Sequence, residues 1–203
     1  SLSVGLALAL LSLGMLVYFI NHIAVSMQAP VVVAAVSDEL QAAINDMSGL
    51  DWLTTDHLEA AAEHLEAADL LVADCNIPSV CLEWTARFAA RHDKRLLIEP
   101  VSVPKARKLL SFARETPIFA ITPNAQQVTA LTGNDDLLGA IANLHGLGFR
   151  NVVVHRGAKG ALASDGSAIA EVPAIAVTDI ADVTGAGDAA VAGLVTGLLE
   201  NRP

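Results

Sequence analysis

The strongest chemical signal in this sequence lies near its C-terminus, in the stretch Asp182-Val183-Thr184-Gly185-Ala186-Gly187-Asp188. The apolar run 189–199 follows and predicts a helix. The small residues 185–187 let a ligand approach the backbone, and their free N–H groups would face it at the positive end of the helix dipole. Asp188 would then lie beside an anion hole, as a carboxylate able to take a proton from an attacking hydroxyl. The pattern predicts phosphoryl transfer with Asp188 as the general base.

Two other interpretations of this stretch stay open at this point. Asp is a favoured helix-capping residue, so Asp188 could simply start a helix after a glycine turn. Gly185, Gly187 and Ala190 also fit the G-x-G-x-x-G/A fingerprint of dinucleotide-binding domains. That fingerprint normally opens such a domain, with an acidic residue about 20 positions further on. Here it stands close to Pro203, where the sequence ends.

The elements that position this stretch are those of an α/β domain. From Ser37 onward, short apolar runs alternate with amphipathic stretches, which predicts a largely parallel sheet. The expected strands are 70–74, 95–98, 119–122 and 152–155, followed by a hairpin of 161–164 and 168–172. The expected helices are 55–67, 79–92, 104–112, 125–131, 137–147 and 189–199. Ligands bind such sheets at the carboxyl ends of the strands, so polar residues in those loops are the candidates for chemistry.

Two segments resemble motifs of the ribokinase-like (PfkB) carbohydrate and nucleoside kinases. Asp182 to Asp188 is similar to their D-x-T-G-A-G-D signature. Thr122-Pro123-Asn124, followed by Leu131-Thr132-Gly133, is similar to their T-P-N…L-T-G segment. The two motifs occur in the family's order and at about its separation. The resemblance implies a ribokinase-like three-layer α/β/α fold with a mostly parallel sheet.

Within the family, three short segments look most like pseudouridine kinases, which phosphorylate the 5′-hydroxyl of pseudouridine with ATP. They are 43–47 (AINDM), 74–77 (DCNI) and 100–106 (PVSVPKA). The resemblance covers about Ser37 to Glu200, so we expect a domain over 37–203 that is incomplete at both ends. It implies a small-molecule sugar or nucleoside substrate. The alternative is a noncatalytic remnant that binds a nucleotide or a partner.

The resemblance also assigns the nucleotide side of the site. It implies that Asn124 faces the nucleotide phosphates. His155-Arg156-Gly157-Ala158-Lys159-Gly160 is similar to the family's T-x-G-x-x-G turn, with Gly157 and Gly160 matching and His155 in place of the usual Thr. We interpret Lys159 as a solvated residue of this turn.

The catalytic and metal residues follow from the same comparison. It implies that Asp188 is the base and that the amides of 185–188 stabilise the transferred phosphoryl group. Asp182 and Thr184 stand where relatives often bind a monovalent cation such as K⁺. The family's N-x-x-E motif ends here in Gln127, which removes a carboxylate that would help to hold hydrated Mg²⁺. We therefore expect weak magnesium affinity, with Gln127 acting at most through water.

One further expectation concerns the substrate lid. In relatives a small β-lid covers the sugar and can mediate dimerisation. Residues 40–47 look like one surviving lid strand, on which Asn45 or Asp46 would face the substrate. An exposed loop is the alternative interpretation. If the lid interpretation holds, a homodimer through this strand is expected.

The composition limits the partners. The 12 Lys and Arg against 22 Asp and Glu give a net charge of −10, which argues against nonspecific binding to nucleic acid. The two cysteines, Cys75 and Cys81, are too few for a disulfide scaffold. We expect them to be small buried thiols in a reducing compartment, as in a cytoplasmic protein.

The N-terminal segment 1–36 stands apart from this domain. Residues 2–20 are all apolar or small, and no charged side chain precedes Asp38. By length, 2–20 predicts a membrane-spanning helix, which would anchor the protein to a membrane. Its flanks lack the Lys or Arg that usually accompany an anchor. A helical membrane segment and a non-native start therefore remain alternatives.

Overall fold

The computed structural model describes residues 52–176 and 185–200. All of them belong to one compact unit, Gly49–Pro203. The predicted apolar segment 1–36 and the predicted lid strand 40–47 lie outside the described residues. Among the helices that are described, none combines the length and the apolar character needed to cross a bilayer.

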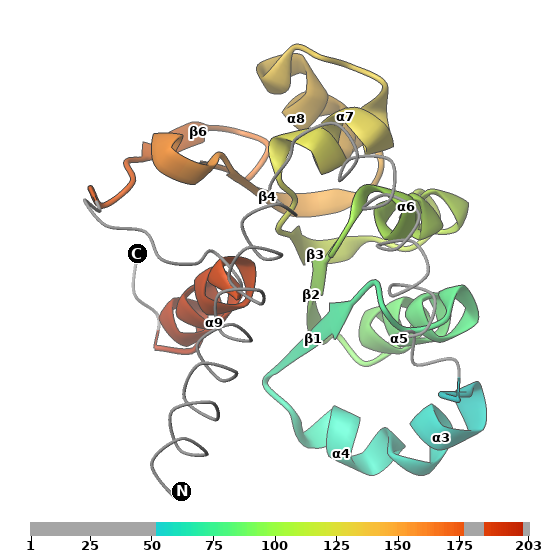
Figure 1. The fold of residues 1–203 in the computed structure, drawn as a ribbon. Coiled ribbons are helices and arrows are strands. Elements are labelled where there is room, and N and C mark those ends of the chain that lie inside the picture. The colour runs from blue at the N-terminus through green and yellow to red at the C-terminus, as the bar shows by residue number, and fades with distance from the viewer. Residues whose placement is uncertain (1–51, 177–184, 201–203) are drawn as a thin grey trace, which may run out of the picture. The chain divides into compact units, whose positions relative to one another are not determined.

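A sheet forms the centre of the described part, in the order β1-β2-β3-β4-β5-β6 (Figure 1). Pairing is parallel from β1 to β4 and antiparallel from β4 to β6. The mostly parallel sheet predicted from the sequence is thus confirmed. The strands are β1 Leu70–Asp74, β2 Arg95–Glu99, β3 Ile118–Ile121, β4 Phe149–His155, β5 Ala161–Ser164 and β6 Ile169–Val172.

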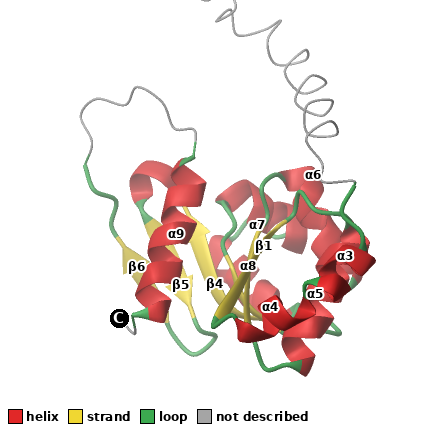
Figure 2. Ribbon diagram, turned by 90° about the horizontal axis from the view of Figure 1, so that it is seen from below, coloured by secondary structure: helices red, strands yellow, loops and turns green. Residues whose placement is uncertain are grey.

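Helices cover both faces of this sheet, which gives three layers. Figures 1 and 2 show α9 on one side of the strands and α5 to α8 on the other. The α-helices are α3 Thr55–Ala60, α4 Ala62–Ala67, α5 Ser79–Arg91, α6 Val103–Ala106, α7 Ala125–Thr132, α8 Leu137–Gly146 and α9 Ala186–Leu199. Two 3₁₀ turns, η1 Arg107–Ser111 and η2 Gly157–Lys159, complete the described elements.

The central strands read as continuous apolar runs because both of their faces are buried. In β2, Leu96 packs in the cluster with α5 to α8, whereas Leu97 packs in the smaller cluster with α9. Alternate residues of a strand point to opposite faces, so a strand buried on both sides cannot alternate apolar with polar residues. At the edge of the sheet, all residues of β6 are exposed.

Two predicted helices differ from the observed elements. The expected helix 55–67 breaks at Ala61 into α3 and α4, neither of which has a fully buried residue. Short helices depend on a packed face, and here packing is too sparse to hold one continuous helix. The expected helix 104–112 is a single α-turn followed by η1. The side chains of Leu109 and Phe112 are both buried, and 3₁₀ geometry aligns residues three apart on one side.

The two cysteines are free and buried, as the sequence predicts. Cys75 follows β1 and is fully enclosed, and this burial raises the pKa of its thiol to about 12. The thiol is therefore uncharged at neutral pH and acts as a small apolar group in the core.

Replacing a central strand residue should strongly destabilise the domain. Ile121 in β3 is fully buried, so Ile121→Ala should lower the free energy of unfolding by about 2–5 kcal/mol through lost burial and a cavity. Urea denaturation followed by circular dichroism measures this loss. The control is Val72→Ala in β1, where the side chain is 51% exposed and the loss should be about 0.5 kcal/mol. Equal losses in the two variants would contradict the described core.

Candidate active site

The parallel strands end at one edge of the sheet, and the polar residues of interest follow those ends. Glu99 is the last residue of β2, Thr122 follows β3, and His155 is the last residue of β4. Asn124 lies beside His155, with which it forms an isolated parallel bridge. Parallel pairing alone therefore gathers residues that are far apart in the sequence.

A cleft of about 530 Å³ opens at this edge. The residues that line it come from the loops after β2 and β3, the turn after β4, the end of β6 and the start of α9. Its lining includes these residues singled out from the sequence: Asn124, Gln127, Gly157, Gly160, Ala186 and Gly187. Two motifs more than fifty residues apart in the sequence thus line one hollow.

The first turn of α9 borders this cleft through Ala186 and Gly187. Gly185 is the N-cap, with φ +77°, and α9 begins at Ala186, three residues earlier than predicted. Among the described residues no side chain caps this end, and the first N–H groups of a helix have no acceptor within the helix itself. Asp188 is an exposed residue of the first turn and is not the cap. The left-handed backbone at Gly185 is the reason that glycine suits this position.

Packing on the sheet fixes the direction of α9. Val191, with Leu194 and Val195, packs against the opposite side of β2 and β3 from the main core. At its far end, the Leu198 carbonyl accepts a hydrogen bond from Arg95 Nη1 at 3.4 Å. Arg95 begins β2, so α9 runs antiparallel to β2, and its N-terminus lies at the carboxyl edge where the cleft opens.

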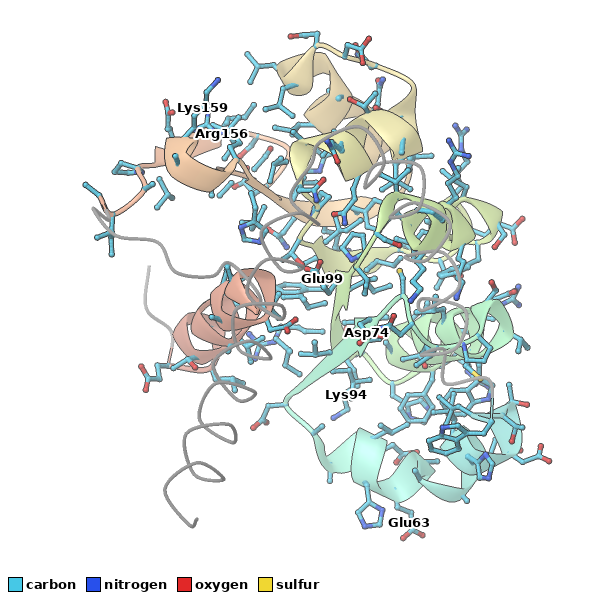
Figure 3. The ribbon with its side chains drawn as sticks, viewed as in Figure 1. Glu63, Asp74, Lys94, Glu99, Arg156 and Lys159 are labelled. Atoms are coloured by element: carbon cyan, nitrogen blue, oxygen red, sulfur yellow. The ribbon has the colours of Figure 1, made fainter. Side chains whose placement is uncertain are left out.

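The turn after β4 is held rigidly by its own hydrogen bonds. Arg156 Nη2 donates to the Lys159 carbonyl at 2.8 Å, and it also pairs with Glu171 on β6; Figure 3 labels Arg156 and Lys159 in this turn. Gly160 has φ +76°, and a Cβ there would lie 2.0 Å from the Val172 carbonyl oxygen. Only glycine allows this close approach, which closes one wall of the cleft.

Glu99 is a cleft residue that the motif analysis missed. Its Oε2 accepts a hydrogen bond from Thr122 Oγ1 at 2.5 Å, and its Oε1 accepts one from the Val101 N–H at 3.3 Å. Burial raises the pKa of Glu99, and this effect is larger than the lowering of the pKa by the two hydrogen bonds. The negative charges of Asp188 and Asp74 raise the pKa further. Figure 3 shows Glu99 and Asp74 at the same edge of the sheet. A carboxylate directly after a buried apolar strand was the available sequence signal.

Several predicted site residues lie outside the described part of the chain. They are Asp182 and Thr184, predicted for a monovalent cation, and Asn45 and Asp46, predicted for the substrate. Within residues 52–176 and 185–200, no group of three or more His, Cys, Asp or Glu side chains could hold a metal ion.

Comparison with known proteins identifies the family. The sequence profile described as "pfkB family carbohydrate kinase" matches residues 27–203. The chain belongs to this family. The pseudouridine kinase of Escherichia coli (strain K12) is 32% identical over 170 residues, which are 81% of this chain and 53% of that protein. The cytidine kinase of Thermococcus kodakarensis is 40% identical over 85 residues, 41% of this chain and 30% of that protein.

Solved structures agree with the family's ribokinase-like fold. A carbohydrate kinase from Agrobacterium tumefaciens superposes with a TM-score of 0.62 at 30% identity, covering 78% of this chain and 50% of that one. Arabidopsis thaliana ribokinase, complexed with ribose and ATP, gives a TM-score of 0.60 at 21% identity over 71% of this chain and 47% of that one. The chain spans about half the length of the curated pseudouridine kinase that it matches.

Gln127 stands where the family motif has a glutamate, and the structure gives its side chain a partner. Gln127 Oε1 accepts a hydrogen bond from the Asn124 N–H at 2.8 Å, while Asn124 Oδ1 accepts one from the Gln127 N–H at 2.9 Å. The pair forms a reciprocal cap on α7, and Gln127 is only 3% exposed. The oxygen predicted to act on a hydrated metal is therefore already engaged, although the side chain borders the cleft.

Restoring a carboxylate at this position should strengthen magnesium binding. A glutamate at 127 would keep the cap on α7 and add a negative charge at the cleft. We expect Gln127→Glu to lower the Mg²⁺ concentration for half-maximal ADP binding by about tenfold, the low end of typical effects of groups that act through a metal's waters. Isothermal titration calorimetry across a magnesium series measures it.

The matched control is Gln126→Glu, which adds the same charge at the exposed neighbouring position. Its magnesium requirement should change much less. An unchanged requirement in Gln127→Glu, or an equal drop in both variants, would contradict a role for this position in metal binding.

Proposed function

We propose that this chain carries the phosphoryl-transfer site of an ATP-dependent kinase that acts on a nucleoside hydroxyl, with pseudouridine as the acceptor. One observation carries the proposal. The N-terminus of α9 and the glycine turn after β4 border one cleft at the carboxyl edge of a parallel sheet. Backbone donors at a helix N-terminus favour bound phosphate.

In this proposal the phosphates of ATP lie between the turn and α9. Gly157 and Gly160 let the chain pass close to the nucleotide, and Asn124 lies beside them on the neighbouring strand end. The N–H groups of 185–187 then donate to the transferred γ-phosphoryl group. They stabilise the charge that develops on its oxygens in the transition state.

Asp188 acts as the base at this anion hole. The hydroxyl oxygen of the acceptor attacks the γ-phosphorus, and its proton passes to the Asp188 carboxylate. The bond from the γ-phosphorus to the bridging oxygen breaks, and ADP leaves with that electron pair. The position of Asp188 in the first turn of α9 supports this role, because the amide donors and the carboxylate share one helical turn.

The oxygen-bearing side chains of the cleft fit a magnesium ion that is held mainly by phosphate oxygens of the nucleotide. Mg²⁺ in such sites keeps several waters and takes one or two carboxylates. Glu99 lines the cleft, and we assign it to hold the metal's waters, beside the neutral Gln127. When bound, the ion neutralises charge on the phosphates. The cation role of Asp182 and Thr184 stays a prediction, as do the substrate roles of Asn45 and Asp46.

The choice of acceptor rests on the sequence similarity to the E. coli pseudouridine kinase. It also rests on the segments 74–77 and 100–106, which resemble such kinases. Both segments lie at the carboxyl ends of β1 and β2, on the side of the cleft away from the nucleotide turn. This arrangement leaves the acceptor on the β1 side and ATP on the β4 side, with Asp188 in the first turn of α9.

Removing the base should nearly abolish turnover while nucleotide binding persists. We expect Asp188→Asn to lower kcat by about 10²–10⁴-fold, because the amide keeps the shape but cannot accept the proton. ADP release with pseudouridine, cytidine and ribose as acceptors measures turnover, and calorimetry measures ADP affinity.

The control is Asp56→Asn, which removes an equivalent carboxylate from the first turn of α3 and should leave turnover unchanged. Equal activity of Asp188→Asn and the unaltered chain would refute the assignment of the base. ADP binding without turnover on any acceptor would instead support the noncatalytic nucleotide-binding alternative.

A further inference from the structure

His155 occupies the boundary between two hollows. It lines the cleft described above and also a second hollow of about 480 Å³, bordered by the start of α7 and by the turn after β4. Asn124 and Gly157 also line both hollows. The imidazole therefore stands at the point where the loop after β3 meets the nucleotide-side turn.

The two ring nitrogens of His155 have no hydrogen-bond partner among the described residues. Nε2 is buried without a partner, whereas Nδ1 is neither hydrogen-bonded nor buried. Burial lowers the pKa of His155, so the ring is uncharged at neutral pH in the free protein. An uncharged ring with one accessible nitrogen can accept or donate a hydrogen bond, and it is ready to take up a proton.

The charges around His155 come from four elements. Arg156 and Lys159 belong to its own turn, and Glu171 on β6 pairs with Arg156. Glu99 at the end of β2 lines the same cleft, and Asp188 on α9 is near enough to Glu99 for its charge to raise the pKa of that carboxyl. The residues of α7 that border the cleft and the second hollow are all uncharged.

We propose that His155 makes phosphate binding in this cleft proton-linked, because its ring borders both hollows with a buried Nε2 that lacks a partner, and it takes up a proton when a nucleotide's phosphates bind beside it. The proposal rests on the proposed function, which places those phosphates between the turn and α9. The threonine usual at this position in the resembling motif does not titrate near neutral pH. The substitution thus adds a response to pH that a hydroxyl cannot give.

The direction of the effect follows from linkage. A bound anion favours the charged ring and raises the pKa of His155 above its value in the free protein. Nucleotide affinity should therefore be highest at pH values below the pKa of the free protein. It should fall as the pH rises through the pKa of the complex. Each unit of difference between the two pKa values changes affinity by about tenfold.

Calorimetry of ADP binding without magnesium tests this inference on the full chain. The dissociation constant is measured from pH 6 to pH 8 for the unaltered chain and for His155→Thr, in two buffers of different ionisation enthalpy. ADP itself titrates in this range, so the comparison is the difference between the two proteins. Both proteins contain Glu99, so the effect of its titration on ADP affinity also cancels in this difference.

We expect affinity to fall by about three- to tenfold more across this range in the unaltered chain than in His155→Thr. We also expect greater proton uptake on binding in the unaltered chain. The control His64→Gln removes an exposed histidine on α4 and should behave as the unaltered chain. If His155→Thr fails to fold, the NMR titration of the His155 ring with and without ADP gives the same test, with the pKa rising on binding.

The outcomes separate this inference from the proposed function. If ADP binds with the same pH dependence and proton uptake in both proteins, His155 is not a proton-linked contact, and the kinase proposal stands. If ADP binds to neither protein at any pH, the nucleotide site itself is wrong, and this inference falls with it.

Discussion

Parallel pairing of β1 through β4 is the constraint on which the rest of the structure depends. It brings the carboxyl ends of four strands to one edge of the sheet, although they are separated by up to about eighty residues along the chain. Glu99, Asn124 and His155 meet there because of strand register and not because they are neighbours in sequence. The antiparallel direction of α9 relative to β2 then brings the glycine-rich turn and Asp188 to the same edge.

The described wall of the cleft exposes few charged side chains and several glycine and alanine residues, whose backbone groups are accessible. Among the described residues that line it, Glu99 is the one acidic side chain and His155 the one titratable base, while glycine and alanine supply much of the wall. Backbone donors at a helix start are fixed by the fold, so they can stabilise an anion without reorganising. Two departures at its margins, Gln127 and His155, therefore change the charge of the site with little change in its shape. In the proposed kinase, the first weakens magnesium binding and the second links nucleotide binding to pH.

Much of the fold and of the cleft could be predicted from the sequence. The apolar runs located the strands to within a few residues, and the two family motifs identified residues that the structure brings to one cleft, such as Asn124 and Gly187. Elements without a buried face were less predictable. The helix expected at 55–67 breaks because little packing holds it together, and α9 starts early because Gly185 adopts a left-handed backbone. Glu99 stands at the end of a predicted strand, where polar residues are candidates for chemistry, but it belongs to neither family motif, and its hydrogen bond to Thr122 depends on β2 lying beside β3.

The central claim is that the turn after β4 and the start of α9 bind one nucleotide together. Hydrogen–deuterium exchange of the full chain, with and without saturating ADP, tests it most directly. The account predicts slower exchange in peptides covering 155–160 and 185–188, with no change in α5, which packs on the opposite face. If saturating ADP slows exchange in only one of these two segments, or in neither of them, the result would contradict a shared nucleotide site.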